Sequence, residues 1–314
     1  MTLHTCSPPV LYEWLKEYPS VAKNYGHLLL EQKKAKDDEL LAVLKPYFES
    51  AHMDARKVFH EFIGIDLHPD SAAGSVDISY PSSLHLTTLK GFFGEVLTGL
   101  IVEAYDLVGE HDWKVPVFLF RFHEDAKKYL YTLVRDPDQK RQTIGRLGTD
   151  FIAISLNKNG EIDRLISGEA KWRKILNQSV IDNLMLGPKK TGQESRQVEK
   201  GIWARLNKEV NPPNGLRELQ IILKDLDRDG YAATILSMDK LLSAYNARAV
   251  PKTDLVVIVG EGSTTREEGS RLIGHEGIPE AYLADNNLQI VEVILNEGEQ
   301  LIEELYRCLW KDED

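Results

Sequence analysis

The chain has only two cysteines, Cys6 and Cys308, which lie near its opposite ends. Two thiols so placed exclude a disulfide framework and a cysteine-based zinc cluster. Long apolar runs are also absent, because each one is short and interrupted by charge, so we expect no membrane-spanning helix. The first residues, MTLHTCSPPVLYEWLKEY, lack the basic, apolar and small-residue regions of a signal peptide. We therefore expect a cytoplasmic protein with no membrane partner.

Positive charge is scarce, and the net charge of the 314 residues is −11. With 42% hydrophobic and 28% charged residues, the chain is typical of a soluble globular protein of one large domain or two smaller ones. Residues 113–209 are an exception, with 19 basic and 12 acidic side chains against 19 and 37 elsewhere. Basic side chains supply most non-specific affinity for nucleic acids. This segment therefore predicts weak nucleic-acid binding, which either a partner assists or the acidic flanks restrain until they are moved. Solvated acidic helix faces are the alternative interpretation.

The most informative motif is Gly168-Glu169-Ala170-Lys171, which lies in a stretch of β-favouring residues over 162–172. Successive residues of a strand point to opposite faces, so Glu169 and Lys171 share one face. Residues 146–156 form a second predicted strand just before it. The two strands predict a hairpin.

Asn159-Gly160 separates the two predicted strands and favours a tight turn, because both residues tolerate positive φ. If these two residues are the turn, Lys158 pairs with Glu161. The same register places Asp150 directly opposite Glu169. Facing residues of an antiparallel pair have Cβ atoms about 4.5–5.5 Å apart, so both carboxylates can bind one hard cation.

Two carboxylates and an ammonium on one face point to metal-dependent phosphoryl chemistry. Like charges that face each other destabilise a sheet unless a cation or a proton compensates. Mg²⁺, or Mn²⁺ in its place, binds one or two carboxylates together with water and substrate phosphates, which suits Asp150 and Glu169. Lys171 could orient or deprotonate the attacking water, or stabilise charge on the phosphate. A surface hairpin with a simple Glu–Lys pair is the alternative.

A predicted helix over residues 89–108 adds a third acid. Its apolar residues recur with helical period and form a broad buried stripe. Glu95 lies in the first turns among aromatic and aliphatic neighbours, where an unpaired charge is costly. We expect Glu95 to reach the hairpin as a further ligand of the metal or the water. An exposed carboxylate near the helix N-terminus is the alternative.

The order of these elements resembles the PD-(D/E)xK nuclease superfamily: a helix with Glu95, a strand, Asp150, and then Glu169-Ala170-Lys171 followed by a helix. Thr149 stands where the motif has proline. More narrowly, the GFFGE, GTDF and SGEAKW segments are similar to the HamA family, the nuclease subunits of Hachiman anti-phage systems, which includes AbpA-type defence proteins. The likeness is densest over residues 89–172.

The resemblance implies an αβββα core in which Asp150, Glu169 and Glu95 hold Mg²⁺ or Mn²⁺ and Lys171 positions the attacking water, so that all four are catalytic. It also implies a metal-dependent deoxyribonuclease that acts on DNA under the control of a HamB-like helicase partner in bacterial defence. Two alternatives stay open. One is a nuclease of a restriction or repair system, and the other is a non-catalytic interaction subunit that keeps the fold.

The predicted organisation is α/β, with an N-terminal helical region over residues 1–83, a nuclease-like core with a mixed sheet over 84–210, and a C-terminal α/β segment over 211–314 that can pack with the core. Outside the segments already described, the predicted helices cover residues 10–17, 25–49, 51–63, 174–186, 216–226, 232–246 and 297–310. The predicted strands cover residues 115–122, 129–134, 253–259 and 288–295.

Three weaker signals do not develop into sites. Residues 259–265 (VGEGSTT) follow a predicted strand but lack the Gly-Lys-Ser/Thr ending of a phosphate loop. Asp225, Asp227 and Asp229 lack the glutamate that a calcium loop has at its twelfth position. His275-Glu276 lacks the second histidine of a zinc-protease helix.

Overall fold

The computed structural model describes residues 9–65, 80–81, 84–108, 113–114, 149–187, 201–209, 212–213, 215–243 and 250–311. The predicted strands at 115–122 and 129–134 and the basic residues between 188 and 200 lie outside these ranges. The strands are β1 Leu15–Ala22, β2 Tyr25–Gln32, β3 Trp113–Lys114, β4 Phe151–Leu156, β5 Ile162–Leu176, β6 Lys252–Gly262 and β7 Asn287–Leu295. The helices are α1 Asp38–Ile65, α2 Leu86–Ala104, α4 Gln178–Leu186, α5 Ile202–Leu206, α6 Gly215–Asp227, α7 Ala232–Leu242 and α8 Gly298–Cys308.

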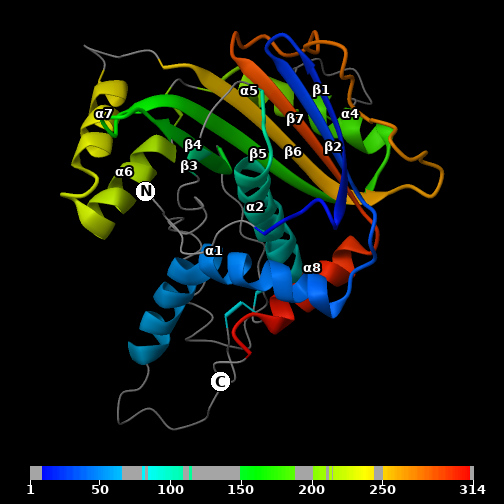
Figure 1. Ribbon diagram of the computed structural model, residues 1–314, viewed down its shortest axis with the longest axis horizontal. Coiled ribbons are helices and arrows are strands. Elements are labelled where there is room, and N and C mark those ends of the chain that lie inside the picture. The colour runs from blue at the N-terminus through cyan, green and yellow to red at the C-terminus, as the bar shows by residue number, and fades with distance from the viewer. Residues whose placement is uncertain are drawn as a thin grey trace, which may run out of the picture.

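The strands form one mixed sheet in the order β1-β2-β7-β6-β5-β4-β3 (Figure 1). Strands β2, β7, β6 and β5 run parallel, whereas the β1–β2, β5–β4 and β4–β3 pairs are antiparallel. Helices cover both faces, which makes a three-layer α/β architecture. The predicted α/β class with a mixed sheet is therefore confirmed. Within the described ranges, no helix combines the length and apolar content needed to cross a membrane.

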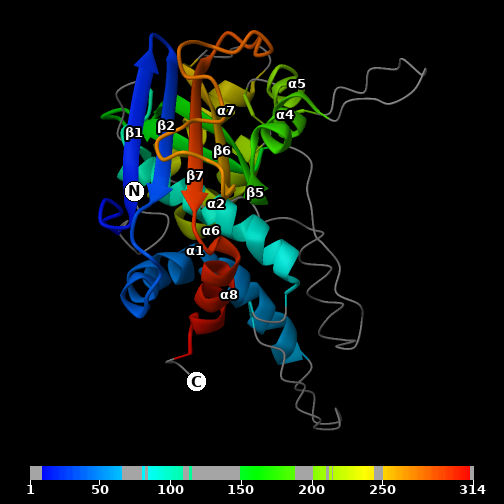
Figure 2. The same cartoon turned by 90° about the vertical axis from the view of Figure 1, so that its right-hand side faces the viewer.

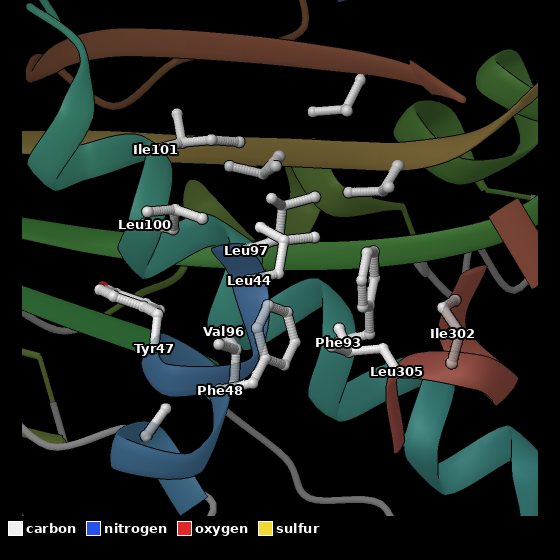
Figure 3. Close-up of a cluster of buried hydrophobic side chains, with 14 of the residues drawn as sticks. Leu44, Tyr47, Phe48, Phe93, Val96, Leu97, Leu100, Ile101, Ile302 and Leu305 are labelled. Carbon is white, nitrogen blue, oxygen red and sulfur yellow. The ribbon is translucent and has the colours of Figure 1, made fainter. Parts of the chain in front are cut away.

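Helices α1, α2 and α8 cover one face of the sheet, here called the α2 face. Side chains of α2 such as Phe93 and Leu97 pack together with Phe48 of α1 and Leu305 of α8 (Figure 3). The ring centroids of Phe48 and Phe93 lie 5.4 Å apart. Large buried aromatic and aliphatic side chains of this kind supply most of the stability of such a layer.

The opposite face, here called the α5 face, is covered in two places. Helices α4 and α5 pack on β6, β7 and β2 through an apolar cluster that includes Trp203 and Ile258. Helices α6 and α7 pack on β4 and the start of β5 through a second cluster that includes Ile152 and Met238. Polar side chains of β5, of β6 and of the two residues just before β4 occupy the strip between these clusters, and they form the site described below.

The N-terminal region differs from its prediction, because residues 10–17 and 25–32 do not form helices. Strands β1 and β2 form an antiparallel hairpin, and β2 pairs in parallel with β7 near the other end of the chain. A short apolar run such as Leu28-Leu29-Leu30 fits a buried strand as well as a helix by its pattern alone. Only the pairing with β7 shows that this run is a strand and not a helix. The helical prediction holds from Asp38 onward, where α1 includes the predicted helix over 51–63.

The β4–β5 hairpin reproduces the predicted register by a different turn. Phe151 pairs with Gly168 and Ser155 with Arg164, as a two-residue turn requires. However, the turn has three residues, since the Asn157 N–H donates to the Glu161 carbonyl at 2.9 Å. Irregular pairing between Ser155 and Leu156 compensates for the extra residue. Gly160 takes φ +76°, as predicted, but Asn159 does not have positive φ, so the predicted two-residue tight turn does not form.

The C-terminal elements agree with prediction: α6, α7 and α8 are helices, and β6 and β7 are buried strands of the same sheet. Helix α7 ends at Leu242, four residues earlier than predicted. Strand β5 continues to Leu176, so α4 starts later than the predicted 174. Asn177 caps α4 by accepting a hydrogen bond from the Val180 N–H at 3.0 Å.

Replacing Gly260 of β6 by alanine should destabilise the sheet by about 1–3 kcal/mol, because an added Cβ would collide with the Arg173 carbonyl and the Leu176 side chain on β5. Urea unfolding measures the change. Gly91→Ala is the matched control, since a Cβ on Gly91 of α2 meets nothing within 4 Å. That variant should gain about 0.5–1 kcal/mol from helix propensity. Equal behaviour of the two variants would contradict the close β5–β6 approach.

Candidate functional site

The structure brings Asp150, Glu169 and Lys171 together on the α5 face. Lys171 Nζ lies 2.5 Å from Glu169 Oε1 and 2.8 Å from Asp150 Oδ2. Glu169 and Lys171 are two residues apart on β5. Asp150 immediately precedes β4, and its N–H donates to the Gly168 carbonyl at 3.0 Å. The ammonium therefore bridges the two facing carboxylates.

Backbone contacts hold the Asp150 carboxylate and the Lys171 ammonium in place. Asp150 Oδ2 accepts a hydrogen bond from the Ala170 N–H at 3.1 Å in addition to the one from Lys171. Lys171 Nζ donates to the Ala170 carbonyl at 3.0 Å. Groups fixed by the backbone in this way need little reorganisation when a charged ligand arrives.

Arg205 is a member of this cluster that the sequence did not identify. It lies on α5, and its Nη2 is 2.5 Å from Glu169 Oε1. Its side chain is 46% exposed, whereas that of Glu169 is 7% exposed, so the guanidinium covers the carboxylate from the solvent side. The basic tract that contains Arg205 was the only signal available, and a basic tract does not single out one residue.

Burial and the neighbouring Asp150 carboxylate raise the pKa of Glu169, and the cations of Lys171 and Arg205 offset this only in part. Burial acts to lower the pKa of Lys171, but the carboxylates of Asp150 and Glu169 outweigh it and raise that pKa. Lys171 is therefore a protonated donor at neutral pH. In this arrangement it can hold a phosphate oxygen or a water molecule.

Glu169→Gln should make the fold more stable at neutral pH, since the raised pKa of Glu169 means that its charged form is disfavoured on folding. In the native chain, stability falls as pH rises from the ordinary Glu value of 4.5 through the raised pKa. The variant lacks this loss. Thermal melting from pH 4 to pH 8 measures both curves. Stability curves that stay parallel across this range would contradict the raised pKa.

A buried polar network lies directly behind the site. Glu209, just after α5, accepts hydrogen bonds from Thr149 and, at 2.7 Å, from Ser167. The ammonium of Lys252 lies 2.8 Å from Glu209 Oε2 and 2.9 Å from Asp254 Oδ1. Through Thr149 and Ser167, the network is continuous with the strands that carry Asp150 and Glu169.

Asp254 ends this network and is fully buried. Its Oδ2 accepts hydrogen bonds from the Tyr282 hydroxyl at 2.6 Å and the Asn286 side chain at 3.0 Å. Burial and the Asp254 carboxylate raise the pKa of Tyr282, so the phenol stays a donor. The network therefore joins Tyr282 and Asn286, which follow β6, to the buried residues behind the site.

Glu95 does not lie on the same face as the cluster. A Cβ added to Gly94 would lie 3.9 Å from the Ala170 Cβ, so α2 covers the face of β5 from which Ala170 projects. Glu169 and Lys171 alternate with Ala170 and project from the other face. The Glu95 charge acts on the α2 face instead, where burial, Tyr80 and Glu95 raise the pKa of Tyr306. The structure therefore places Glu95 on a helix that covers the other face of the sheet from Asp150, Glu169 and Lys171, and the convergence of Glu95 on the hairpin stays a prediction.

The donor set fits a divalent cation that shares its coordination with a substrate. Within the described part of the chain, no group of three His, Cys, Asp or Glu side chains is placed to hold a metal ion. Asp150 and Glu169 supply two carboxylates, which is the usual protein contribution to a Mg²⁺ site that also binds phosphate and water. Lys171 and Arg205 would have to move aside from Glu169 Oε1 as the cation binds.

Comparison with protein-family models finds no match to this chain, and comparison with curated proteins finds none.

Proposed function

We propose that this chain is a metal-dependent nuclease that hydrolyses phosphodiester bonds in DNA. The observation that carries the proposal is the placement of the Lys171 ammonium between two facing carboxylates, 2.5 Å from Glu169 and 2.8 Å from Asp150. The arrangement of an acid on one strand and Glu-x-Lys on the next, in a mixed sheet, resembles the PD-(D/E)xK core. A surface Glu–Lys pair fits less well, because both carboxylates are largely buried.

Asp150 and Glu169 would hold Mg²⁺ or Mn²⁺, and Glu95 is left out of the ligand set because of its place on the α2 face. Such an ion, when bound, polarises the phosphate and lowers the pKa of a bound water. Lys171 donates to a phosphate oxygen or to the attacking water. Arg205, half-exposed at the mouth of the site, can turn from Glu169 to the phosphate, where a guanidinium binds in a bidentate manner.

The substrate and the partner follow from charge and resemblance. A net charge of −11 disfavours free binding to DNA, and the basic surplus is confined to residues 113–209. A helicase partner that grips and delivers the DNA would supply the missing affinity. We therefore propose that the chain is the nuclease subunit of a bacterial anti-phage defence complex of the Hachiman type.

The direct test is a cleavage assay on linear and circular DNA with Mg²⁺ or Mn²⁺, with and without a HamB-like helicase. We expect cleavage that requires the metal, stops with a chelator, and increases when the helicase is present. Undiminished cleavage in the chelator would exclude a metal mechanism. Absence of cleavage under every condition would leave the non-catalytic subunit as the better proposal.

A second readout does not depend on activity. Mg²⁺ or Mn²⁺ should raise the melting temperature of the chain, since a ligand at a hundred times its Kd stabilises the folded state by about 2.7 kcal/mol. Asp150→Asn should remove this effect. A matched control is Glu161→Gln in the same hairpin, where Glu161 pairs with Lys240 at 2.9 Å. A metal shift of equal size in both variants would place the ion elsewhere.

The two rival functions are separable. A restriction or repair nuclease would share the site but would be encoded without the helicase neighbour. An interaction subunit would keep its biological effect in Glu169→Ala and Lys171→Ala variants that still fold. A nuclease should lose the effect in both variants while it keeps its partner.

A further inference from the structure

The parallel strands of the sheet create a second place where a ligand can bind. Strand β7 leads into α8, which packs on the α2 face (Figure 2). The neighbouring strand β6 leads into residues 263–286, which pack on the α5 face through Ile273 and Tyr282. Where the connections of adjacent parallel strands leave on opposite faces, a crevice opens outside their carboxyl ends, and α/β proteins bind ligands there.

A cavity of about 560 Å³ lies at this point. Its walls include residues that follow three parallel strands, namely Lys33 after β2, Ser263 and Thr264 after β6, and Asn296 after β7. The volume falls within the range of about 300–1,000 Å³ that small-molecule sites occupy. The lining is mainly polar, so the cavity does not continue the apolar core.

The crevice is fixed by hydrogen bonds between the elements around it. The Asn296 N–H donates to Gln32 Oε1 at 2.9 Å, which joins the ends of β7 and β2. The Arg266 side chain is only 8% exposed and pairs with the buried Glu31 carboxylate. Arg266 also donates to the Ser270 carbonyl, so its side chain forms a fixed part of the wall.

The charges around the crevice favour an anion. Arg266 is paired with Glu31, and Lys16 with Glu268 at 2.6 Å. Lys33 is exposed and has no ion pair within the part of the chain that the structure describes. Its ammonium is therefore the positive charge of the lining that no carboxylate of the lining neutralises. The hydroxyls of Ser263 and Thr264 add neutral donors beside it.

We propose that this crevice binds a nucleoside monophosphate. An ammonium and two hydroxyls suit the oxygens of one phosphate, and the volume leaves room for a nucleoside. A triphosphate fits less well, because residues 259–265 lack the Gly-Lys-Ser/Thr cradle that binds several phosphates. The site is distinct from the cluster of Asp150, Glu169 and Lys171, and the proposal does not depend on nuclease activity.

The test is calorimetric titration of the full chain with AMP, GMP, CMP and UMP, and with adenosine and inorganic phosphate as partial probes. We expect saturable binding of at least one monophosphate, weaker binding of phosphate, and no binding of adenosine. Lys33→Ala should weaken binding about tenfold, the effect of one lost charge-assisted hydrogen bond. Lys34→Ala is the control, because Lys34 is held by Asp37 and Glu39 at 2.9 Å each.

Four results would overturn the proposal, and the first three concern binding by the native chain and its crevice variants. One is the absence of saturable binding of every monophosphate at millimolar concentration. A second is binding that neither Lys33→Ala nor Ser263→Ala weakens, and the third is phosphate binding as tightly as all four monophosphates. Glu169→Gln should bind the monophosphate like the native chain. Loss of binding in that variant would move the ligand to the β5 cluster and also overturn the proposal.

Discussion

Asp150→Asn and Glu169→Gln should each lower metal-dependent DNA cleavage by about 10³-fold. Both substitutions keep the size of the side chain and remove the charge that a divalent ion requires. The chemistry that such an ion supplies is worth several kcal/mol of transition-state stabilisation. Initial rates of cleavage in the presence of the proposed helicase partner measure the effect.

The controls for this experiment separate catalysis from folding. Glu161→Gln removes a carboxylate that is paired with Lys240 in the same hairpin, and it should keep full activity. Glu169→Gln should also fold at least as stably as the native chain, because the raised pKa of Glu169 shows that burial of its charge is unfavourable. If Glu169→Gln cleaved DNA at the native rate, Glu169 would not be part of the catalytic site, whatever the behaviour of the control.

Lys252→Met should destabilise the fold by about 3–5 kcal/mol. The Lys252 side chain is 2% exposed, and its ammonium lies between the carboxylates of Glu209 and Asp254. Removing one partner of a buried ion pair leaves an uncompensated buried charge, which costs more than the pair itself contributes. Urea unfolding gives the free energy of unfolding of the variant and the native chain.

A double variant identifies the cause of this loss. Lys252→Met combined with Asp254→Asn should recover part of the stability, because the amide removes the unpaired charge while Tyr282 and Asn286 still reach the side chain. Lys240→Met, in an exposed pair, should change stability by less than about 0.5 kcal/mol. If Lys252→Met were as stable as Lys240→Met, the Lys252 ammonium would not be needed to compensate the buried charges of Glu209 and Asp254.

The candidate site could be predicted from sequence to the extent that it is local. Glu169 and Lys171 share a face because a strand alternates, and Asp150 faces Glu169 because the hairpin register follows from a short turn. The turn itself was mispredicted by one residue, and the irregular pairing next to Leu156 corrected the error. The predicted register was therefore correct partly because the longer turn and the irregular pairing next to Leu156 cancel each other.

Arg205 and Glu95 show where local reasoning fails. The position of Arg205 over Glu169 depends on how α5 packs on the α5 face, through an apolar cluster that includes Trp203 and Ile258. The position of Glu95 depends on which face of the sheet α2 covers. Helical periodicity predicts that a helix has a buried side, but both faces of this sheet are buried. The period therefore cannot choose between them.

The sequence by itself determined the α/β class, most C-terminal elements, the long α2 helix and the shared face of Glu169 and Lys171, because periodicity and turn chemistry act over a few residues. Tertiary structure alone decided that the N-terminal segment is a hairpin beside β7, that Arg205 and the Glu209–Lys252–Asp254 network support the site, and that a crevice opens between β6 and β7. Those features require contacts between segments that are far apart in the chain, or the choice of one sheet face over the other. Such contacts are set by the packing of the whole sheet and leave no short pattern in the chain.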